Sequence, residues 1–98
     1  MALSLDAGSV VWRLPSEFNI YQAASLASEL VSALGHDLPL RCELDAVQEI
    51  DCSGLQLLLL AERESQRAGH TFSVTRHSEA SREAVMVMGL TQFLEDTP

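Results

Sequence analysis

IDCSGLQLLLLA, residues 50–61, is the most apolar run of this chain and begins with small and polar side chains. Such residues directly before an apolar periodic run are typical of a strand-to-helix junction. The predicted helix begins at Gly54 or Leu55 and continues to about Ala68, where Gly69 favours its end. The other elements can be ordered outward from this junction.

The leucines of this helix cover more than one face. Leu55, Leu58 and Leu59 share the side that we expect to pack on a sheet, whereas Leu57 and Leu60 then point away from it. A helix that is apolar around most of its circumference is either deeply buried or in contact with a partner. Two alternatives therefore stay open for Leu57 and Leu60: a partner contact, or cover by the third helix.

Extended and helical patterns alternate along the rest of the chain. We expect strands near residues 3–5, 10–14, 40–44 and 72–75, helices near 20–34, 54–68 and 79–88, and a short closing strand at 91–94. The first two strands can form an antiparallel hairpin, and the alternation that follows implies parallel crossovers. The sequence therefore predicts an α/β fold with a mixed sheet and helices packed mainly on one face.

Two further expectations concern helix faces and ends. Ile20, Leu30 and Val31 recur at helical spacing and are expected to face the core, and Gly35 is expected to end that helix with a positive φ. Ser78 is a predicted N-cap of the last helix.

Length, composition and charge limit the possible functions. The chain has 98 residues, 47% of them hydrophobic, and a formal net charge of −8. We expect one domain over residues 1–98, with no nucleic-acid partner, because phosphate recognition needs clustered basic residues. No apolar run is long enough to span a membrane and no signal peptide is evident, so we expect a cytoplasmic protein without direct membrane insertion.

Cysteine and histidine usage predicts no metal site or cofactor. The two cysteines, Cys42 and Cys52, make no disulfide framework and do not fall at metal-ligand spacing with the histidines. We interpret Cys52 as a small packing residue. No P-loop, dinucleotide-binding or Gly-x-Ser-x-Gly pattern is present, so we expect no catalytic residue.

Ser53 has two interpretations. As an N-cap, its hydroxyl would accept a bond from a backbone N–H, and Gln56 would complete a capping box. As a phosphorylation site, it would place a phosphate against the unpaired N–H groups of a helix N-terminus. Asp51 would either repel that phosphate or orient the Ser53 hydroxyl.

The segment Ile50–Leu55 with the leucine-rich helix behind it resembles the motif of the STAS domain family, and Met88-Gly89-Leu90 followed by Phe93 resembles that family's usual ending. The resemblance covers almost the whole chain. The family includes bacterial anti-sigma factor antagonists, in which the serine before the motif's glycine is phosphorylated by a partner kinase that is itself the anti-sigma factor. That position is Ser53 here, and the motif's acid corresponds to Asp51.

The resemblance implies a non-catalytic signalling module that docks a serine kinase of the anti-sigma type, or an equivalent signalling protein, and is switched by phosphorylation of Ser53. We expect the contact surface to contain the following residues: Asp51, Cys52, Ser53, Gly54, Leu57, Leu60, Ser16, Glu17 and Asn19.

Two departures from the family pattern favour an alternative. Cys52 stands where the family often has Ser or Thr, and residues 15–18 replace its usual Gly-x-Leu-Asp. The alternative is a structural STAS subunit of a chemotaxis or phospholipid-transport complex, without phosphorylation. A small hydrolase that uses Ser53 is a third hypothesis.

Overall fold

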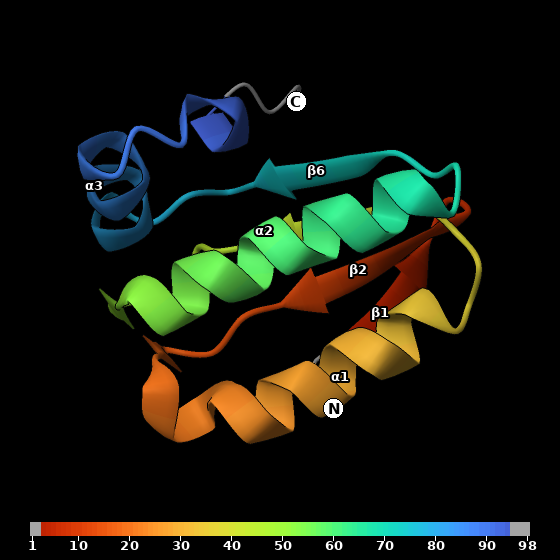
Figure 1. Cartoon of the computed structure of the whole chain (residues 1–98), viewed down its shortest axis with the longest axis horizontal. Coiled ribbons are helices and arrows are strands. Elements are labelled where there is room, and N and C mark those ends of the chain that lie inside the picture. Colours follow the sequence, from red (N-terminus) through yellow and green to blue (C-terminus); the bar gives the residue numbers. More distant parts are fainter. Residues whose placement is uncertain (1–2, 95–98) are drawn as a thin grey trace.

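A four-stranded mixed sheet forms the centre of the molecule in the computed structural model, which describes residues 3–94 (Figure 1). Its strands are β1 (Leu3–Asp6), β2 (Ser9–Arg13), β4 (Leu40–Glu43) and β6 (Phe72–Thr75), in the spatial order β1-β2-β4-β6. β1 is antiparallel to β2, whereas β2, β4 and β6 are mutually parallel. The predicted mixed α/β sheet is confirmed.

The hairpin between β1 and β2 turns through two residues. Ala7 and Gly8 both have positive φ, 54° and 83°. Two-residue hairpin loops favour this conformation because its twist matches that of the flanking strands. The turn fixes the register, with Asp6 opposite Ser9 and Leu3 opposite Trp12.

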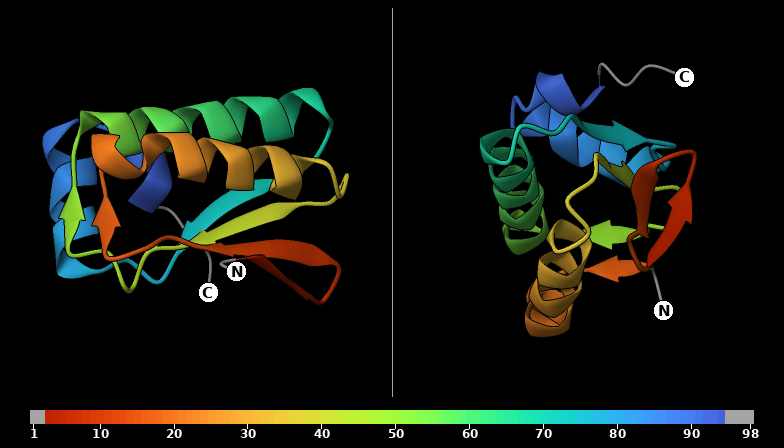
Figure 2. Two further views of the ribbon diagram at one scale, coloured as in Figure 1. Left: turned by 90° about the horizontal axis from the view of Figure 1, so that it is seen from below. Right: turned by 90° about the vertical axis from the view of Figure 1, so that its right-hand side faces the viewer.

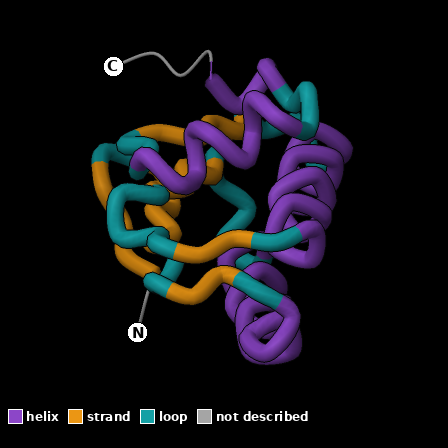
Figure 3. The backbone as a smooth tube through the Cα atoms, turned by 90° about the vertical axis from the view of Figure 1, so that its left-hand side faces the viewer, coloured by secondary structure: helices purple, strands orange, loops and turns teal. Residues whose placement is uncertain are grey.

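A second, smaller sheet lies where the parallel strands end. β3 (Glu17–Phe18) and β5 (Glu49–Ile50) pair in parallel. Figure 3 looks onto this end of the molecule, where the two short strands run side by side ahead of the helices. Because Phe18 is fully buried, this small sheet is attached to the core.

The two longest helices lie side by side along one face of the sheet (Figure 2). They are α1 (Ala23–Leu34), preceded by the 3-10 turn η1 (Ile20–Gln22), and α2 (Cys52–Arg67). A third helix, α3 (Glu79–Val87), lies at the end where β2 and β6 finish (Figure 1). Within residues 3–94, no helix has the length and apolar character needed to cross a membrane.

The predicted closing strand at residues 91–94 is wrong. Thr91–Leu94 forms the 3-10 turn η2. Its Phe93 is buried and meets Phe72 of β6 edge-to-face, with ring centroids 6.0 Å apart. The 3-10 turn η2 therefore places the Phe93 ring against the sheet without a strand.

The predicted buried face of α1 is partly wrong. Leu30 is buried, together with Leu26 and Ala33, whereas Ile20 and Val31 are 62% and 70% exposed. Ile20 belongs to a 3-10 turn, so it does not continue the 3.6-residue period. Val31 lies about 100° around the helix from Leu30, beyond the sector that the sheet covers.

Gly35 does not have the positive φ that its position suggested. Its φ is −65°, and the positive φ after this helix falls on Asp37, at 55°. The chain therefore turns two residues later than expected.

Candidate functional site

Helix α2 begins earlier than predicted, at Cys52. Its N-cap is Asp51, whose Oδ1 accepts a hydrogen bond from the Gly54 N–H at 3.2 Å. Ser53 is thus the second residue of the helix, and the interpretation of Ser53 as the cap, paired with Gln56, is wrong. The aspartate two residues upstream already fills that role.

The second oxygen of the same carboxylate reaches across to η1. Asp51 Oδ2 accepts a hydrogen bond from the Ile20 N–H at 3.2 Å. One side chain therefore joins the start of α2 to a turn that lies 31 residues earlier in the chain. This bond fixes η1 beside the start of α2.

Asn19 and Glu49 strengthen the same attachment. The Asn19 side chain accepts from the Tyr21 N–H at 3.0 Å and donates to Glu49 Oε2 at 2.7 Å. With 4% exposure, Asn19 offers little surface to a partner. We expected Asn19 among the contact residues, but its side-chain amide is hydrogen-bonded to Tyr21 of η1 and Glu49 of β5.

Gly54 permits a close approach between α2 and β3. A Cβ added at Gly54 would lie 2.6 Å from the Phe18 carbonyl oxygen and 3.1 Å from Ile50 Cγ1. Both distances are too short for ordinary contacts, and the nearer atom belongs to the backbone. Glycine at this position is explained by packing, since its φ is not positive.

The start of α2 presents small side chains at the surface. Ser53 is half-buried and Cys52 is exposed. The interpretation of Cys52 as a packing residue is therefore wrong, because the earlier start of the helix turns it outward. Within the described residues, no side-chain hydrogen bond involves the Ser53 hydroxyl.

The outward side of α2 continues from Ser53. Gln56 is exposed and Leu60 is 37% exposed. Positions 53, 56 and 60 share one side of a helix because they are separated by three and four residues. Leu60 thus lies where the sequence placed it, and with Gln56 it borders a shallow groove on this side.

Leu57 does not point away from the core. Its side chain is 9% exposed and belongs to the main apolar cluster with Leu55 and Leu58. The outward direction expected for Leu57 is wrong. Helix α1 packs beside α2, so the buried sector of α2 is wider than the sheet alone requires. Of the two leucines expected to point away from the core, only Leu60 is exposed enough to contact a partner.

The β3 segment borders the junction. Ser16 and Glu17 are both exposed, and the Ser16 carbonyl accepts from the N–H groups of Gln48 and Glu49 at 2.9 and 3.0 Å. Glu17 pairs in register with Glu49, which precedes Asp51 by two residues. The two strands that lead to the start of α2 therefore each carry an acidic residue.

Two exposed apolar residues at this site were not recognised in the sequence. Tyr21 is 89% exposed and Ile20 is 62% exposed, and the bond from Ile20 to Asp51 holds both beside the start of α2. The apolar periodicity had assigned Ile20 to the core. Asn19, a residue type favoured at helix starts, was the available signal that Ile20 and Tyr21 belong to the first turn, which need not follow the buried face of the later residues.

No metal site accompanies this surface. Among residues 3–94, no three His, Cys, Asp or Glu side chains gather closely enough to hold a metal ion.

A family model described as "Mlab, STAS domain" matches residues 1–95 of this sequence. No curated protein matches it. A STAS domain protein from Planctomyces limnophilus has a similar structure, with a TM-score of 0.79 at 16% identity over 90% of this chain and 80% of that chain.

Two structures of the anti-sigma factor antagonist SpoIIAA are also similar. The unphosphorylated form gives a TM-score of 0.74 at 20% identity, over 90% of this chain and 79% of that chain. The phosphorylated form from Bacillus gives 0.71 at 19% identity, over 93% and 85%. At these identities, the likeness establishes the fold.

Proposed function

We propose that this chain, which belongs to the STAS domain family, is a bacterial signalling module that docks a partner protein and releases it when Ser53 is phosphorylated. STAS domains are generally non-catalytic, and we assign no catalytic residue. The partner is a serine kinase of the anti-sigma type or an equivalent signalling protein.

One observation carries the proposal: Asp51, and not Ser53, caps α2. A serine at a helix start usually has its hydroxyl occupied by a backbone N–H. Here the carboxylate of Asp51 takes that bond, so the half-buried Ser53 hydroxyl has no capping role and lies at the surface. A kinase can reach such a hydroxyl without first breaking the cap.

The contact surface that we propose surrounds this hydroxyl. Cys52, Gln56 and Leu60 extend it along α2, and Ser16 and Glu17 border it on the β3 side. Asp51 and Gly54 shape it from beneath: Asp51 joins α2 to η1, and Gly54 brings α2 close to β3.

Electrostatics and bulk explain how phosphorylation would end docking. A phosphate on Ser53 adds about −1.5 to −2 charges at neutral pH. The N-terminal end of α2 stabilises that charge locally, because the first N–H groups of a helix carry partial positive charge. In the docked state, however, the same dianion lies between two protein surfaces and must lose its hydration, which opposes binding.

A similar fold that exists in both phosphorylation states supports this proposal. SpoIIAA has been described in both a phosphorylated and an unphosphorylated form, and both share the fold of this chain. We therefore expect phosphorylation of Ser53 to leave the fold intact.

The first experiment asks whether Ser53 is modified. We expect intact mass spectrometry of the protein from its native cell to detect a species heavier by one phosphate. Ser53→Ala should remove this species, and Ser28→Ala, at an exposed serine of α1, should retain it. A phosphorylated species that survives Ser53→Ala would place the modification elsewhere and contradict the proposal.

The second experiment asks whether the charge controls docking. Tagged protein is recovered from native cells, the co-purifying kinase is identified, and its affinity for purified variants is measured. Ser53→Asp should weaken binding at least about tenfold, whereas Ser28→Asp should not change it. Equal affinity of Ser53→Asp and the unmodified chain would eliminate the switch.

A second candidate function is a structural subunit of a chemotaxis or phospholipid-transport complex. The matching family model is named Mlab and not after an anti-sigma factor antagonist, which is the observation that favours this candidate. In that case the Ser53 surface is a permanent interface. Two results would favour this candidate over the switch. Protein from native cells would carry no phosphate, and the Ser53→Asp variant would still assemble into the complex.

A further inference from the structure

Strand β1 is an edge of the main sheet. Within the described residues it pairs only with β2. Asp6 and Ser9 close a two-residue hairpin and therefore form a hydrogen-bonded pair, and such pairs alternate along antiparallel strands. Ser4 consequently bonds to β2, while Leu3 and Leu5 direct their backbone N–H and C=O groups outward.

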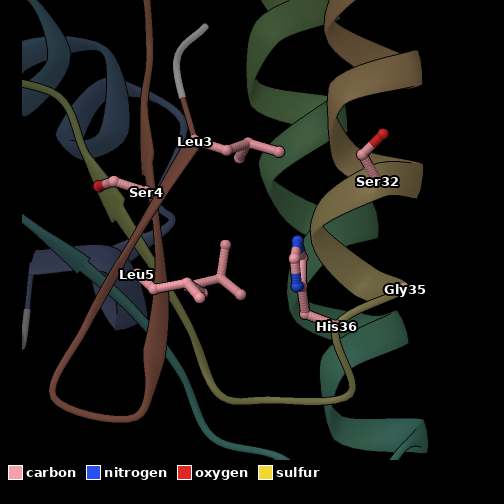
Figure 4. A pocket seen from close by; sticks show the side chains of 7 residues that line it. Leu3, Ser4, Leu5, Ser32, Gly35 and His36 are labelled. Atoms are coloured by element: carbon pink, nitrogen blue, oxygen red, sulfur yellow. The ribbon is translucent and has the colours of Figure 1, made fainter.

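An apolar groove runs beside this edge. It lies between β1 and the end of α1, has a volume of about 540 Å³, and is lined by Val10, Gly35 and His36 as well as the β1 leucines. Figure 4 shows Leu3 and Leu5 pointing toward α1 and His36, and Ser4 pointing the other way. With 63% exposure, Leu5 lies largely uncovered in this groove.

Natural proteins usually protect such an edge with charges, proline or a bulge. In β1 the one charged residue is Asp6, at the end of the strand, and Arg41 pairs with it at 2.8 Å. The opposite edge strand, β6, is in contact with Phe93 of η2. Thus β1 is the less protected edge, and its charge is already compensated.

We propose that a second copy of this chain pairs with β1, antiparallel and about a two-fold axis at Ser4. In this register Leu3 of one copy lies opposite Leu5 of the other, and each such pair exchanges both backbone hydrogen bonds. All four leucines lie on the side of α1, so each groove receives leucines from the other copy. The two sheets become one continuous sheet.

Charge limits the register in which a second copy can pair, because two chains of the same sign repel each other. Each chain carries a net charge of −8, so two copies associate only where their acids stay apart. The two-fold axis places the two Asp6 carboxylates at opposite ends of the paired strands, each beside its own Arg41. Cross-strand leucine pairs add apolar contact, and no like charges face each other.

This pairing leaves the Ser53 surface free. The hairpin lies at the opposite end of the sheet from the start of α2 (Figure 2, left). A dimer would therefore carry two docking surfaces. The pairing does not depend on the proposed switch, since the hairpin and the start of α2 lie at opposite ends of the sheet.

Sedimentation velocity of the full chain from about 1 μM to about 1 mM tests the pairing. We expect the average mass to rise from one chain of 10.7 kDa toward two. Leu5→Pro should abolish the rise, because it removes an outward N–H that β2 does not use. Leu5→Lys should abolish it by placing charge in the groove, and Val87→Lys, at a 77% exposed site on α3, should leave it unchanged.

Circular dichroism checks that each variant is folded. If Leu5→Pro does not fold, Leu5→Lys alone decides, because a 63% exposed side chain tolerates lysine. A chain that stays monomeric at every concentration overturns the inference. So does a dimer that persists in Leu5→Lys, including one formed through another surface. A monomer whose Leu5 backbone amide shifts on titration with an unrelated extended peptide also overturns it, by assigning the groove to a different occupant.

Discussion

Helices α2 and α3 differ in the side chain that caps their first backbone N–H groups. At α3, Ser78 is the N-cap and its hydroxyl accepts from the Ser81 N–H at 3.0 Å. At α2, Asp51 is the N-cap, accepts from the Gly54 N–H, and also holds the Ile20 N–H of a distant turn. The first cap is local, whereas the second also contributes to tertiary structure.

The difference determines what each serine can do. At α3 the Ser78 hydroxyl accepts the capping bond, so a kinase would have to break this bond to reach the hydroxyl. At α2 the side chain of Asp51 is the cap. The hydroxyl of Ser53, two residues later, makes no hydrogen bond within the described residues. A serine at a helix start is thus a cap or a candidate switch according to whether another side chain already satisfies the N–H groups.

Gly54→Ala should have the largest effect and test how tightly α2 is held against β3. The new Cβ would meet the Phe18 carbonyl oxygen at 2.6 Å, and two backbone segments would have to separate. We expect a loss of about 2–3 kcal/mol in the free energy of unfolding, measured by urea denaturation.

Gly35→Ala is the matched control. Its Cβ would be 3.4 Å from the Ser32 carbonyl oxygen and its φ is −65°, so we expect a change within about 0.5 kcal/mol. Equal effects of the two substitutions would show that the close approach at Gly54 is not the cause.

Asp51→Ala should rank second, because it removes a cap and a long-range tether together. We expect a loss of about 2 kcal/mol, compared with about 1 kcal/mol for Ser78→Ala. Amide hydrogen exchange at Ile20 should accelerate in Asp51→Ala and stay unchanged in Ser78→Ala. Unchanged exchange at Ile20 in both variants would contradict the tether.

Local pattern predicted most of the fold. Alternation identified β2 and β4, helical spacing identified three helices, and Ser78 was correctly recognised as a cap because its bond spans three residues. These features depend on neighbours in sequence. The short strands β3 and β5 were missed because each is two residues long and is stabilised by pairing with the other across the fold.

The site was predicted less completely, for the same reason. The motif around Ser53 located the junction, but spacing alone could not distinguish capping by Asp51 from capping by Ser53. The Asp51–Ile20 bond spans 31 residues and leaves no local pattern. Leu57 and Asn19 were placed on the surface because their buried state depends on α1 and β5, elements that are distant in sequence.

Ser53→Ala should have the smallest effect and gives the sharpest test of the comparison. If Asp51 alone caps α2, removing the Ser53 hydroxyl deletes no structural hydrogen bond, and alanine is the better helix former. We therefore expect urea denaturation to show a change within about 0.5 kcal/mol, against the loss of about 1 kcal/mol expected for Ser78→Ala. If Ser53→Ala destabilises the protein as much as Ser78→Ala, then Ser53 shares the capping role. Its hydroxyl would then be occupied in the folded state, and phosphorylation would have to compete with the helix for it.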